Sequence, residues 1–594
     1  MDEANSMFGR LARSPIVWAS ILAVLITGAQ LPYSHLIEDD YIHVAILEGR
    51  LDDYGRAPFR LYSFLEGDPE QMRRAIERGP VPWLAHPEME VDFFRPLSSA
   101  LLALDHAIVG RKAWGYKLQS IAWYLTIVIT LGCLLLRSKP GDTQTSRLLV
   151  TLAPIVLALS PGHWQNVMYN ASRWVLVATA LGSIGLLAHI RWREEGWRPG
   201  SGLSVVAFAL SLLAGEAGVA FLAYLAAYEF VAAPGDRTER ARGLAPTAVL
   251  LVTYVVAYRV MGFGSHGGDG YLDPLGRPVA FLHDLPTRLL AMLGELLAGV
   301  PGWLWAVESR RLYTTLAGAG GVVLMAVLLV PAWKLASRET RRLIGWLILG
   351  AGGSLLPLAA SPPGSRHLIV PFIGVSTLIA FVIAHWWTVL RRGLTPVTAL
   401  AGIVCVAVVF VHLVAAPYRW FSQSVAFDRG ATWLERTVRE TEFVRGEATG
   451  QRTVFLTTYL NVAFNGYFLR TLNGQPMPER WWILSAAPFT HRYLRTASDT
   501  LELEFPEGQM LGTFQERSIR SAASPLSAGD RIELSGMEVT ILEVNEIGPT
   551  RIRFTFDRPL EDLSLRFMAV VRGELRPIQP PLPGEAIDLR GVGG

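Results

Sequence analysis

The chain has 594 residues, of which 51% are hydrophobic and 18% are charged. A soluble domain carries charge on about a quarter of its residues, so this composition excludes an ordinary soluble protein. The formal net charge is only +3, which gives no support to a nucleic-acid partner. Cys133 and Cys405 lie in separate apolar stretches, and we expect them to be buried thiols without a disulfide.

Apolar stretches of about 20 residues recur from Ile16 to Ala416, which predicts an all-α, polytopic membrane bundle. The first stretch follows two arginines, as in a signal peptide, but no small-x-small cleavage site follows it, so we interpret it as a membrane anchor. The fifth and sixth stretches are short because Gly215-Glu216-Ala217-Gly218 divides them. Eleven spans are expected, at about 16–36, 114–136, 148–163, 170–190, 203–214, 217–233, 244–262, 312–333, 343–360, 367–389 and 396–416.

Lysine and arginine are distributed unequally between the two sets of short loops. One set contains 17 of them, whereas the opposite set contains only Arg173 and Arg366. Cytoplasmic loops carry the excess of positive charge, so the first set is expected in the cytoplasm of a cell with this protein in its inner (cytoplasmic) membrane. The N-terminus would then be cytoplasmic and the C-terminal region extracytoplasmic. The 17 residues are Arg10, Arg13, Arg137, Lys139, Arg147, Arg191, Arg193, Arg198, Arg237, Arg240, Arg242, Lys334, Arg338, Arg341, Arg342, Arg391 and Arg392.

This orientation predicts a membrane domain at 1–419 with two long outer loops, 37–113 and 263–311, followed by a β-rich extracytoplasmic domain at 420–594. The segment Leu97–Val109 is too short to span and is expected along the interface. The run Gly262–Gly270 lacks the flanking strand and helix of a phosphate-binding fingerprint, and we interpret it as a flexible loop. In the last domain, Arg531–Val544 and Thr550–Phe556 alternate as half-buried strands do, and a connecting helix is expected at about 428–446.

An acidic cluster, Glu38-Asp39-Asp40, follows directly on the first apolar stretch. A charge at the centre of a bilayer costs about 2.5–3.5 kcal/mol even on lenient scales, so these carboxylates must lie at the membrane surface. A general base at the mouth of a membrane-embedded cleft would occupy this place. A solvated acidic cap on a helix end is the alternative interpretation, and the cluster by itself does not decide between them.

Polar residues that do not belong in a membrane gather at the outer ends of the other spans. One such residue is usually a snorkelling or capping side chain, but five separate turns at one level favour a shared site. Carboxylates offer a base or a metal ligand, and arginine or lysine can hold a phosphate, which together indicate a lipid-linked phosphate as substrate. No Ser-His-Asp, HExxH or Walker signature supports a hydrolase or an ATPase. The residues are Arg95, Lys117, His163, Arg173, Glu216, Arg366 and His367.

Several short motifs occur in a recognisable order between residues 16 and 390. They are Glu38-Asp39-Asp40; Phe94-Arg95-Pro96-Leu97 with Leu104-Asp105-His106 and Gly110; Trp114-Gly115-Tyr116-Lys117-Leu118; Ser160-Pro161-Gly162-His163 with Ser172-Arg173; Gly215-Glu216; and Ser365-Arg366-His367-Leu368. This order resembles the C-type, polyprenyl-phosphate-sugar-dependent glycosyltransferase superfamily. Within it, the pattern is most similar to the membrane part of the O-mannosyltransferases with tetratricopeptide tails.

The resemblance implies an acidic residue of the first outer loop as catalytic base, which corresponds here to Asp40, with Asp39 second. It also implies cations beside the donor phosphate, and these are assigned to Arg366, Arg173 and Arg95, with Lys117 on the same side. Glu216, His163, His367 and Glu38 complete the expected site. No cofactor is certain; Mg or Mn, if bound, would be held by Asp39 and Asp40.

Two departures from the family pattern stand out. Gly215 occupies the position where the family usually has a lysine, so a cation is missing beside Glu216 in the sequence. The tetratricopeptide tail is replaced by residues 420–594, so the acceptor cannot be inferred from the family.

The sequence thus predicts transfer of one sugar from a polyprenyl-phosphate donor to a protein, glycan or lipid acceptor outside the membrane, with inversion or retention left open. A transporter or flippase for a lipid-linked glycan and a non-catalytic envelope-assembly scaffold are the alternatives. Transporters often show inverted repeats and polar groups at the midplane, whereas here no repeat is evident and the polar groups lie at one face, which favours the enzyme.

Overall fold

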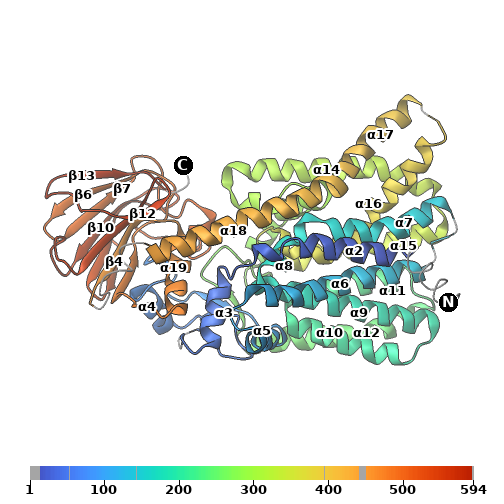
Figure 1. Ribbon diagram of the computed structural model, residues 1–594, viewed down its shortest axis with the longest axis horizontal. Helices are drawn as coiled ribbons and strands as arrows, with labels where there is room; N and C mark the ends of the chain where they lie inside the picture. The colour runs from blue at the N-terminus through green and yellow to red at the C-terminus, as the bar shows by residue number, and fades with distance from the viewer. Residues whose placement is uncertain are drawn as a thin grey trace. The chain divides into compact units, whose positions relative to one another are not determined.

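The computed structural model describes residues 14–51, 54–138, 140–141, 143–393, 395–440 and 450–591. Three of the 17 basic loop residues, Arg10, Arg13 and Lys139, lie outside these ranges. The chain divides into two compact units (Figure 1). The first contains Met1–His35, Phe94–Gly262 and Pro274–Asp428, and the second contains Leu36–Phe93, Phe263–Asp273 and Arg429–Gly594.

The first unit is a bundle of helices. Its α-helices are α2 (Pro15–Gly28), α5 (Pro96–Val109), α6 (Ala113–Arg137), α7 (Gln144–Leu159), α8 (Trp164–Met168), α9 (Trp174–Glu195), α10 (Pro199–Ala214), α11 (Phe221–Val231), α12 (Arg237–Val260), α13 (Pro278–Ala298), α14 (Glu308–Leu335), α15 (Arg338–Leu358), α16 (Ile369–Leu390) and α17 (Pro396–Val409), and α18 (Ala416–Glu440) leads into the second unit. Short helical turns join them: η1 (Leu31–Tyr33), η2 (Pro161–His163), η3 (Asn170–Ser172), η4 (Glu216–Ala220), η5 (Gly302–Ala306), η6 (Ser365–Leu368) and the π-turn η7 (Phe410–Ala415).

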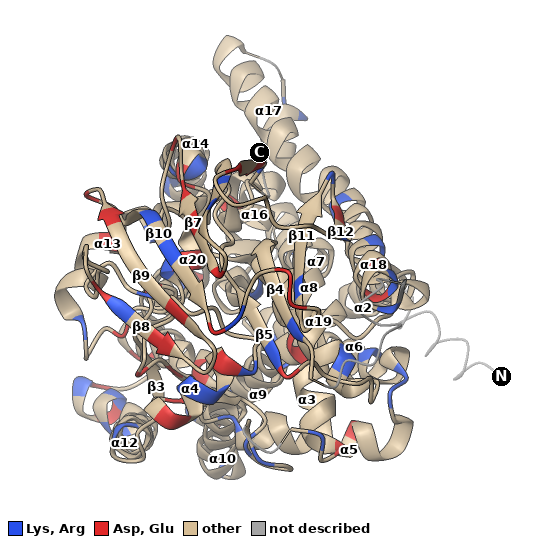
Figure 2. Ribbon diagram, turned by 90° about the vertical axis from the view of Figure 1, so that its left-hand side faces the viewer, with Lys and Arg blue, Asp and Glu red and all other residues tan. Residues whose placement is uncertain are grey.

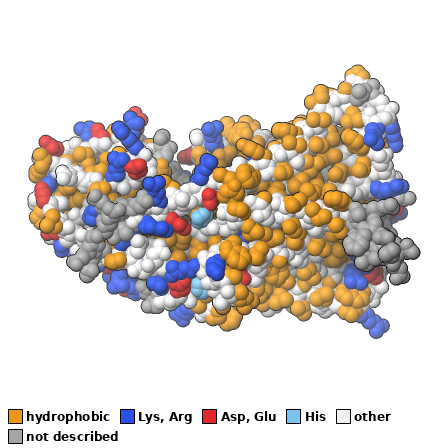
Figure 3. Space-filling view, in the orientation of Figure 1, with side chains coloured by type: hydrophobic (Ala, Val, Ile, Leu, Met, Phe, Trp, Pro, Cys, Tyr) orange, Lys and Arg blue, Asp and Glu red, His pale blue; other side chains and the backbone are white. Residues whose placement is uncertain are grey.

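Helix α16 lies at the centre of this bundle. Its sequence carries no acidic or basic residue other than His385, and its most apolar stretch is entirely buried against helices that include α7 and α15. By contrast, α12, α14 and α17 turn large aliphatic side chains outward, among them Val252, Leu324 and Leu400. Figure 3 shows hydrophobic side chains gathered over the helices of this unit. Such a surface is suited to lipid, because an exposed apolar patch of this extent is unusual in a soluble monomer.

Six helical segments in the described part of the chain are long and apolar enough to cross a membrane, or seven if α7 and the bent segment Pro161–Met168 form one span. This finding supports a multi-pass membrane protein. The expected count of eleven is not confirmed, because several predicted spans form short helices: α2 has 14 residues, α10 has 16 and α11 has 11. The segment predicted along the interface is α5, a helix of 14 residues.

The second unit is built from three sheets. An antiparallel sheet contains β1 (Ser63–Glu66), β2 (Glu90–Asp92) and β3 (Gly264–His266), in that order. A six-stranded antiparallel sheet has the order β13-β6-β7-β10-β9-β8, with β6 (His491–Ala497), β7 (Thr500–Glu504), β8 (Arg531–Leu534), β9 (Met537–Val544), β10 (Pro549–Phe556) and β13 (Ala586–Leu589). The four-stranded sheet has the order β12-β11-β4-β5, with β4 (Arg452–Thr457), β5 (Arg480–Ile483), β11 (Leu565–Val571) and β12 (Glu574–Pro577). Helices α3 (Asp39–Leu47), α4 (Pro69–Glu77), α19 (Leu460–Leu472) and α20 (Phe514–Arg517) accompany the sheets.

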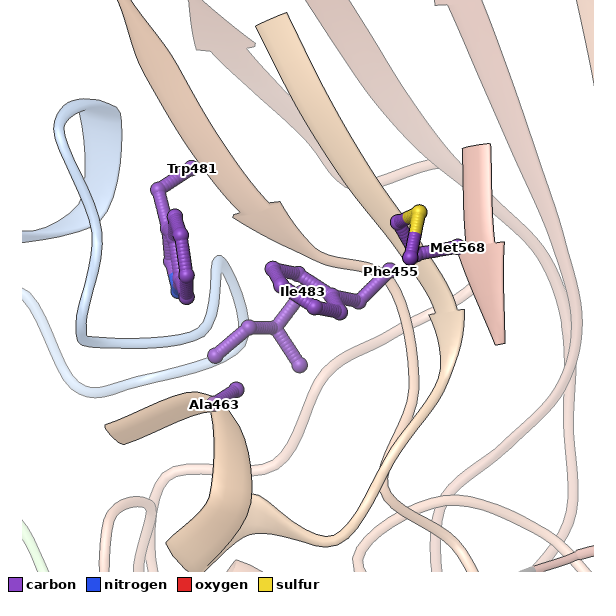
Figure 4. Close-up of a cluster of buried hydrophobic side chains, with 5 residues drawn as sticks. All are labelled: Phe455, Ala463, Trp481, Ile483 and Met568. Atoms are coloured by element: carbon purple, nitrogen blue, oxygen red, sulfur yellow. The ribbon is translucent and has the colours of Figure 1, made fainter. Parts of the chain in front are cut away.

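The alternating runs predicted as strands form β8, β9 and β10, as expected for a β-rich region. Figure 2 shows acidic and basic residues spread over the strands of the six-stranded sheet. The carboxylate of Glu502 on β7 is buried and accepts hydrogen bonds from Arg551 and Arg553 on β10. In the four-stranded sheet, Phe455, Trp481, Ile483 and Met568 form a buried cluster with Ala463 of α19 (Figure 4). The connecting helix predicted at 428–446 is the end of the longer α18, and residues 441–446 lie outside the described residues.

The Gly262–Gly270 run is not the flexible loop that we predicted. Its residues 264–266 form β3 and pair with β2, and the carboxylate of Asp269 accepts hydrogen bonds from Ser521 Oγ at 2.6 Å and the Ala522 N–H at 2.9 Å. The interpretation was wrong because the partners of this run are distant in the chain: β2 lies more than 170 positions earlier, and Ser521 lies 252 positions later.

The predicted boundary at 419/420 kept both outer loops with the membrane domain, whereas the structure groups residues 36–93 and 263–273 with the C-terminal strands. Buried contacts explain this grouping. The indole N–H of Trp83 donates to the Leu484 carbonyl at 2.9 Å, and Arg520 donates to the Leu84 carbonyl at 2.6 Å. The outer loops therefore contribute core residues to the second unit.

Candidate functional site

In the first unit, an ion pair on an aromatic face lies at the centre of the predicted site. Arg95, the residue before α5, donates from Nε to Glu216 Oε2 at 2.8 Å, and its guanidinium lies 3.7 Å from the centroid of the Trp174 ring. Arg95 is buried, and Tyr258 OH donates to the other carboxylate oxygen of Glu216 at 3.3 Å. Four elements distant in sequence meet here, so an arginine that would be costly alone in an apolar bundle is both paired and stacked.

The η6 turn brings two further predicted residues to the same cluster. Arg366 donates from Nε to Nε2 of His367 at 3.0 Å, and the His367 ring lies 6.0 Å from Trp174 between ring centroids. Asn166 of α8 donates to the Arg366 carbonyl at 2.8 Å. The chain bends by 42° between α7 and the segment Pro161–Met168. Asn166 lies on this segment, and the bend allows it to reach the η6 turn. The structure therefore assembles Arg95, Glu216, Arg366 and His367 around Trp174.

Trp174 also explains the glycine that departs from the family pattern. A Cβ atom on Gly215 would collide with the ring of Trp174, so no lysine fits at this position with Trp174 in place. Arg95 supplies the positive charge beside Glu216 instead. The cation that the sequence indicated to be missing is thus present, contributed by a residue 121 positions earlier in the chain.

Two predicted phosphate-binding cations have protein partners. Arg173 is fully buried; its Nη1 forms an ion pair with Asp105 Oδ2 at 2.5 Å and donates to the Tyr116 carbonyl at 2.9 Å. Lys117 is also buried and donates to the Tyr33 carbonyl at 3.4 Å. These contacts hold α5, α6 and α9 together, and they add a packing role to the one predicted from the sequence.

His163 has ring contacts with residues outside the Trp174 cluster. It is fully buried in η2, with its ring 5.8 Å from that of Tyr124 and 5.4 Å from that of Phe372. Neither ring nitrogen has a hydrogen-bond partner in the described part of the chain. The surroundings are those of a core side chain.

Sequence reasoning missed Glu295, a buried carboxylate of α13. Glu295 accepts hydrogen bonds from the Gly302 N–H at 2.7 Å and from the hydroxyl of Ser365. Ser365 immediately precedes Arg366, so this carboxylate anchors the turn that presents Arg366 and His367. The available signal was an acidic residue in the apolar second half of α13, residues 289–298.

The three acidic residues of the first outer loop belong to the second unit. Glu38 is exposed, Asp39 is half-buried and Asp40 is buried at the first turn of α3. Glu38 has a φ of +46°, a left-handed conformation that is uncommon for a residue with a side chain and that often marks functional sites. Asp40 Oδ2 accepts from the Ile37 N–H at 3.3 Å, and the helix N-terminus favours negative charge on both aspartates.

Tyr41, next to Asp40, is a second buried polar group at this helix end. Burial raises the pKa of the Tyr41 phenol, and the nearby carboxylates of Glu435 and Asp40 raise it further. The phenol is therefore protonated at neutral pH, and its hydroxyl has no hydrogen-bond partner among the described residues.

A metal site does not emerge from these contacts. Adjacent helical residues such as Asp39 and Asp40 do not face each other. Among the residues that the structure describes, no group of three or more His, Cys, Asp or Glu side chains is placed to hold a metal ion.

Comparison with known proteins yields matches among solved structures only. No protein-family model and no curated protein matches the chain. ArnT from Cupriavidus metallidurans bound to undecaprenyl phosphate is similar over 77% of this chain and 84% of its own, at 13% identity and a TM-score of 0.37. The arabinofuranosyltransferase AftD from Mycobacteria is similar over 91% of this chain but only 40% of its own, at 14% identity and a TM-score of 0.36.

The first of these structures holds undecaprenyl phosphate, and the second is named as an arabinofuranosyltransferase. A likeness of this degree does not transfer an activity, so the function of this chain rests on its own residues.

Proposed function

We propose that the protein transfers a sugar from a polyprenyl-phosphate donor to an acceptor hydroxyl on the outer face of the membrane. The observation that carries the proposal is the cluster around Trp174. Two arginines, Arg95 and Arg366, are placed there at helix ends by turns that are far apart in sequence. Arginine offers a planar fork of donors that matches phosphate oxygens, and it keeps its charge when buried.

In the proposed reaction, the Asp40 carboxylate accepts the proton of the acceptor hydroxyl. The acceptor oxygen then bonds to the anomeric carbon of the sugar, while the bond from that carbon to the phosphate oxygen breaks. The products are the glycosylated acceptor and the polyprenyl phosphate, which gains one negative charge. Arg366 and Arg95 stabilise that charge as it develops, and a general base contributes about 10²–10⁴-fold to such a step.

Asp40 is assigned as the base because of its burial and its place in the chain. It follows the first expected span, 16–36, by four residues, so its backbone cannot be far from the membrane surface. Its fixed bond to the Ile37 N–H orients the carboxylate, and Asp39, the half-buried neighbour, is the second candidate. No step is routed through a metal ion.

The proposed topology has a cytoplasmic N-terminus and an extracytoplasmic second unit. The 17-to-2 distribution of lysine and arginine between the short loops supports it. Donor and acceptor would then meet outside the cytoplasm of the cell.

The decisive experiment incubates the purified protein with a panel of radiolabelled polyprenyl-phosphate sugars and membrane extract. We expect label to move from one donor to an extractable acceptor, and Asp40→Asn to abolish the transfer while the protein still folds and inserts. Full turnover by Asp40→Asn would remove this residue as the base, and loss of transfer only in Asp39→Asn would exchange the two roles. Movement of intact donor across a vesicle membrane without transfer would instead identify a flippase.

A further inference from the structure

A polar cavity lies in the helical unit, at the opposite end of α9 from Arg173. It has a volume of about 730 Å³ and is lined by residues that include Ser138, Glu194, Arg240, Arg338, Arg342 and Trp346. Arg173 precedes the first residue of α9 and Glu194 is its penultimate residue. A helix of 22 residues is about 33 Å long, so the cavity is separate from the Trp174 cluster.

Three arginines give the cavity an excess of positive charge. Arg240 is held by the carbonyls of Gly235 at 3.1 Å and Phe230 at 2.9 Å, which fix the guanidinium without neutralising it. Arg338 and Arg342 lie one turn apart at the start of α15, where the helix dipole adds positive potential. Neither guanidinium group makes a hydrogen bond or an ion pair with another described residue.

Two carboxylates, Glu194 and Glu339, face the same cavity. Glu194 accepts a hydrogen bond from Tyr228 OH at 3.2 Å, so part of its hydrogen-bonding capacity is already used within the protein. Three cations and two carboxylates leave a net charge of +1, with two arginines available to an anion.

Apart from Ser138, the rest of the lining is apolar, and it includes the buried side chains of Leu343 and Trp346. This end of the bundle carries the basic loops that the positive-inside distribution assigns to the cytoplasm. A headgroup phosphate could contact Arg338 and Arg342 there while its glycerol and upper acyl carbons lie against the apolar wall. Basic pockets between helices at this depth suit phosphate headgroups.

We propose that this cavity binds the phosphate of an anionic phospholipid from the cytoplasmic leaflet. The proposal is independent of the sugar transfer, because it uses other residues at the other end of the bundle. Its chemistry is that of a phosphodiester recognised by paired guanidinium groups, which free phosphate could also satisfy.

The test is native mass spectrometry of the full-length protein, purified in detergent and titrated with phosphatidylglycerol or phosphatidylcholine. The variant is Arg338→Gln with Arg342→Gln, and the matched control is Arg341→Gln, which alters an exposed arginine of the same helix that does not line the cavity. We expect wild type to prefer phosphatidylglycerol, and the double variant to lose about fivefold in affinity per arginine, or about 25-fold in all. Replacing both arginines with lysine keeps the charges but loses the forked contacts, so the affinity of this variant should lie between those of wild type and the double glutamine variant.

Equal binding of the two lipids by wild type would overturn the proposal. So would an equal loss in Arg341→Gln, since a general surface charge would then explain the effect. A third titration with inorganic phosphate separates the sources of the ligand: binding of phosphate that depends on Arg338 and Arg342, without binding of phosphatidylglycerol, would overturn the assignment to a lipid.

Discussion

The substitution Glu216→Gln should lower the free energy of unfolding and, at the same time, raise the affinity of the protein for a phosphate. In the structure, Glu216 neutralises the buried Arg95 through a 2.8 Å bond. Glutamine keeps an acceptor of the same shape but removes the charge. Arg95 would remain stacked on Trp174, but the carboxylate of Glu216 would no longer offset its positive charge.

The size of the effect follows from these contacts. Breaking a fully buried ion pair costs about 3–5 kcal/mol, but the Glu216 side chain is 30% exposed and the stacking on Trp174 persists. Exchange of a charge-assisted hydrogen bond for a neutral one costs about 1 kcal/mol. We therefore expect the free energy of unfolding without ligand to fall by about 1–3 kcal/mol.

The predicted effect of this substitution on ligand affinity has the opposite sign. A polyprenyl phosphate that binds Arg95 no longer competes with Glu216, so its affinity should rise by about tenfold, which corresponds to about 1.4 kcal/mol. Thermal unfolding of the detergent-purified protein, with and without polyprenyl phosphate, measures both quantities because bound ligand raises the melting temperature. Arg95→Gln should lower the free energy of unfolding and should also remove the rise in melting temperature that polyprenyl phosphate causes.

Glu308→Gln, which removes an exposed carboxylate at the first residue of α14, is the matched control. It should lower the free energy of unfolding by at most about 0.3–1 kcal/mol and leave the response to ligand unchanged. Two results would refute the reasoning. Unchanged stability of Glu216→Gln without ligand would show that the ion pair contributes nothing. Unchanged stabilisation by polyprenyl phosphate would remove Arg95 from the phosphate site.

Three further predictions follow from the structure. Arg366→Lys should weaken donor binding by about 1–3 kcal/mol in a donor titration, because lysine loses the forked contact, whereas unchanged donor dependence would indicate a snorkelling residue. Glu295→Ala should reduce donor affinity and thermal stability more than Glu295→Gln, since alanine leaves the Gly302 N–H and the Ser365 hydroxyl without an acceptor; equal effects would argue against its anchoring role. Burial raises the pKa of Glu516 to about 7 from 4.5, so its contribution to the stability of the second unit is largest below pH 4.5 and is lost as the pH rises towards 7 and above, by about 3 kcal/mol. Hydrogen exchange around α20, corrected for the intrinsic rate, should therefore show Glu516→Gln matching wild type at pH 5 and exceeding it in protection at pH 8; the same difference at both values would contradict the assignment.

Much of the candidate site could be predicted from the sequence as a set of residues. Charged and polar side chains in an apolar chain are conspicuous, and on that ground the sequence indicates Arg95, Glu216, Arg366 and His367. Their partners could not be predicted. Nothing local in the sequence pairs Arg95 with Glu216 across 121 positions, and nothing identifies Glu295 as the anchor of the Arg366 turn.

The sequence by itself determined the membrane character of the first unit and three strands of the second, β8, β9 and β10. Both follow from local patterns, because a run of apolar residues must avoid water and an alternating run must bury one face. Only the tertiary structure decided that the first outer loop joins the C-terminal sheets, that Gly262–Gly270 contains a paired strand, and that Trp174 excludes a side chain at Gly215 while holding Arg95 beside Glu216. Each of these depends on close packing between segments distant in the chain, and such contacts leave no periodic trace in the sequence.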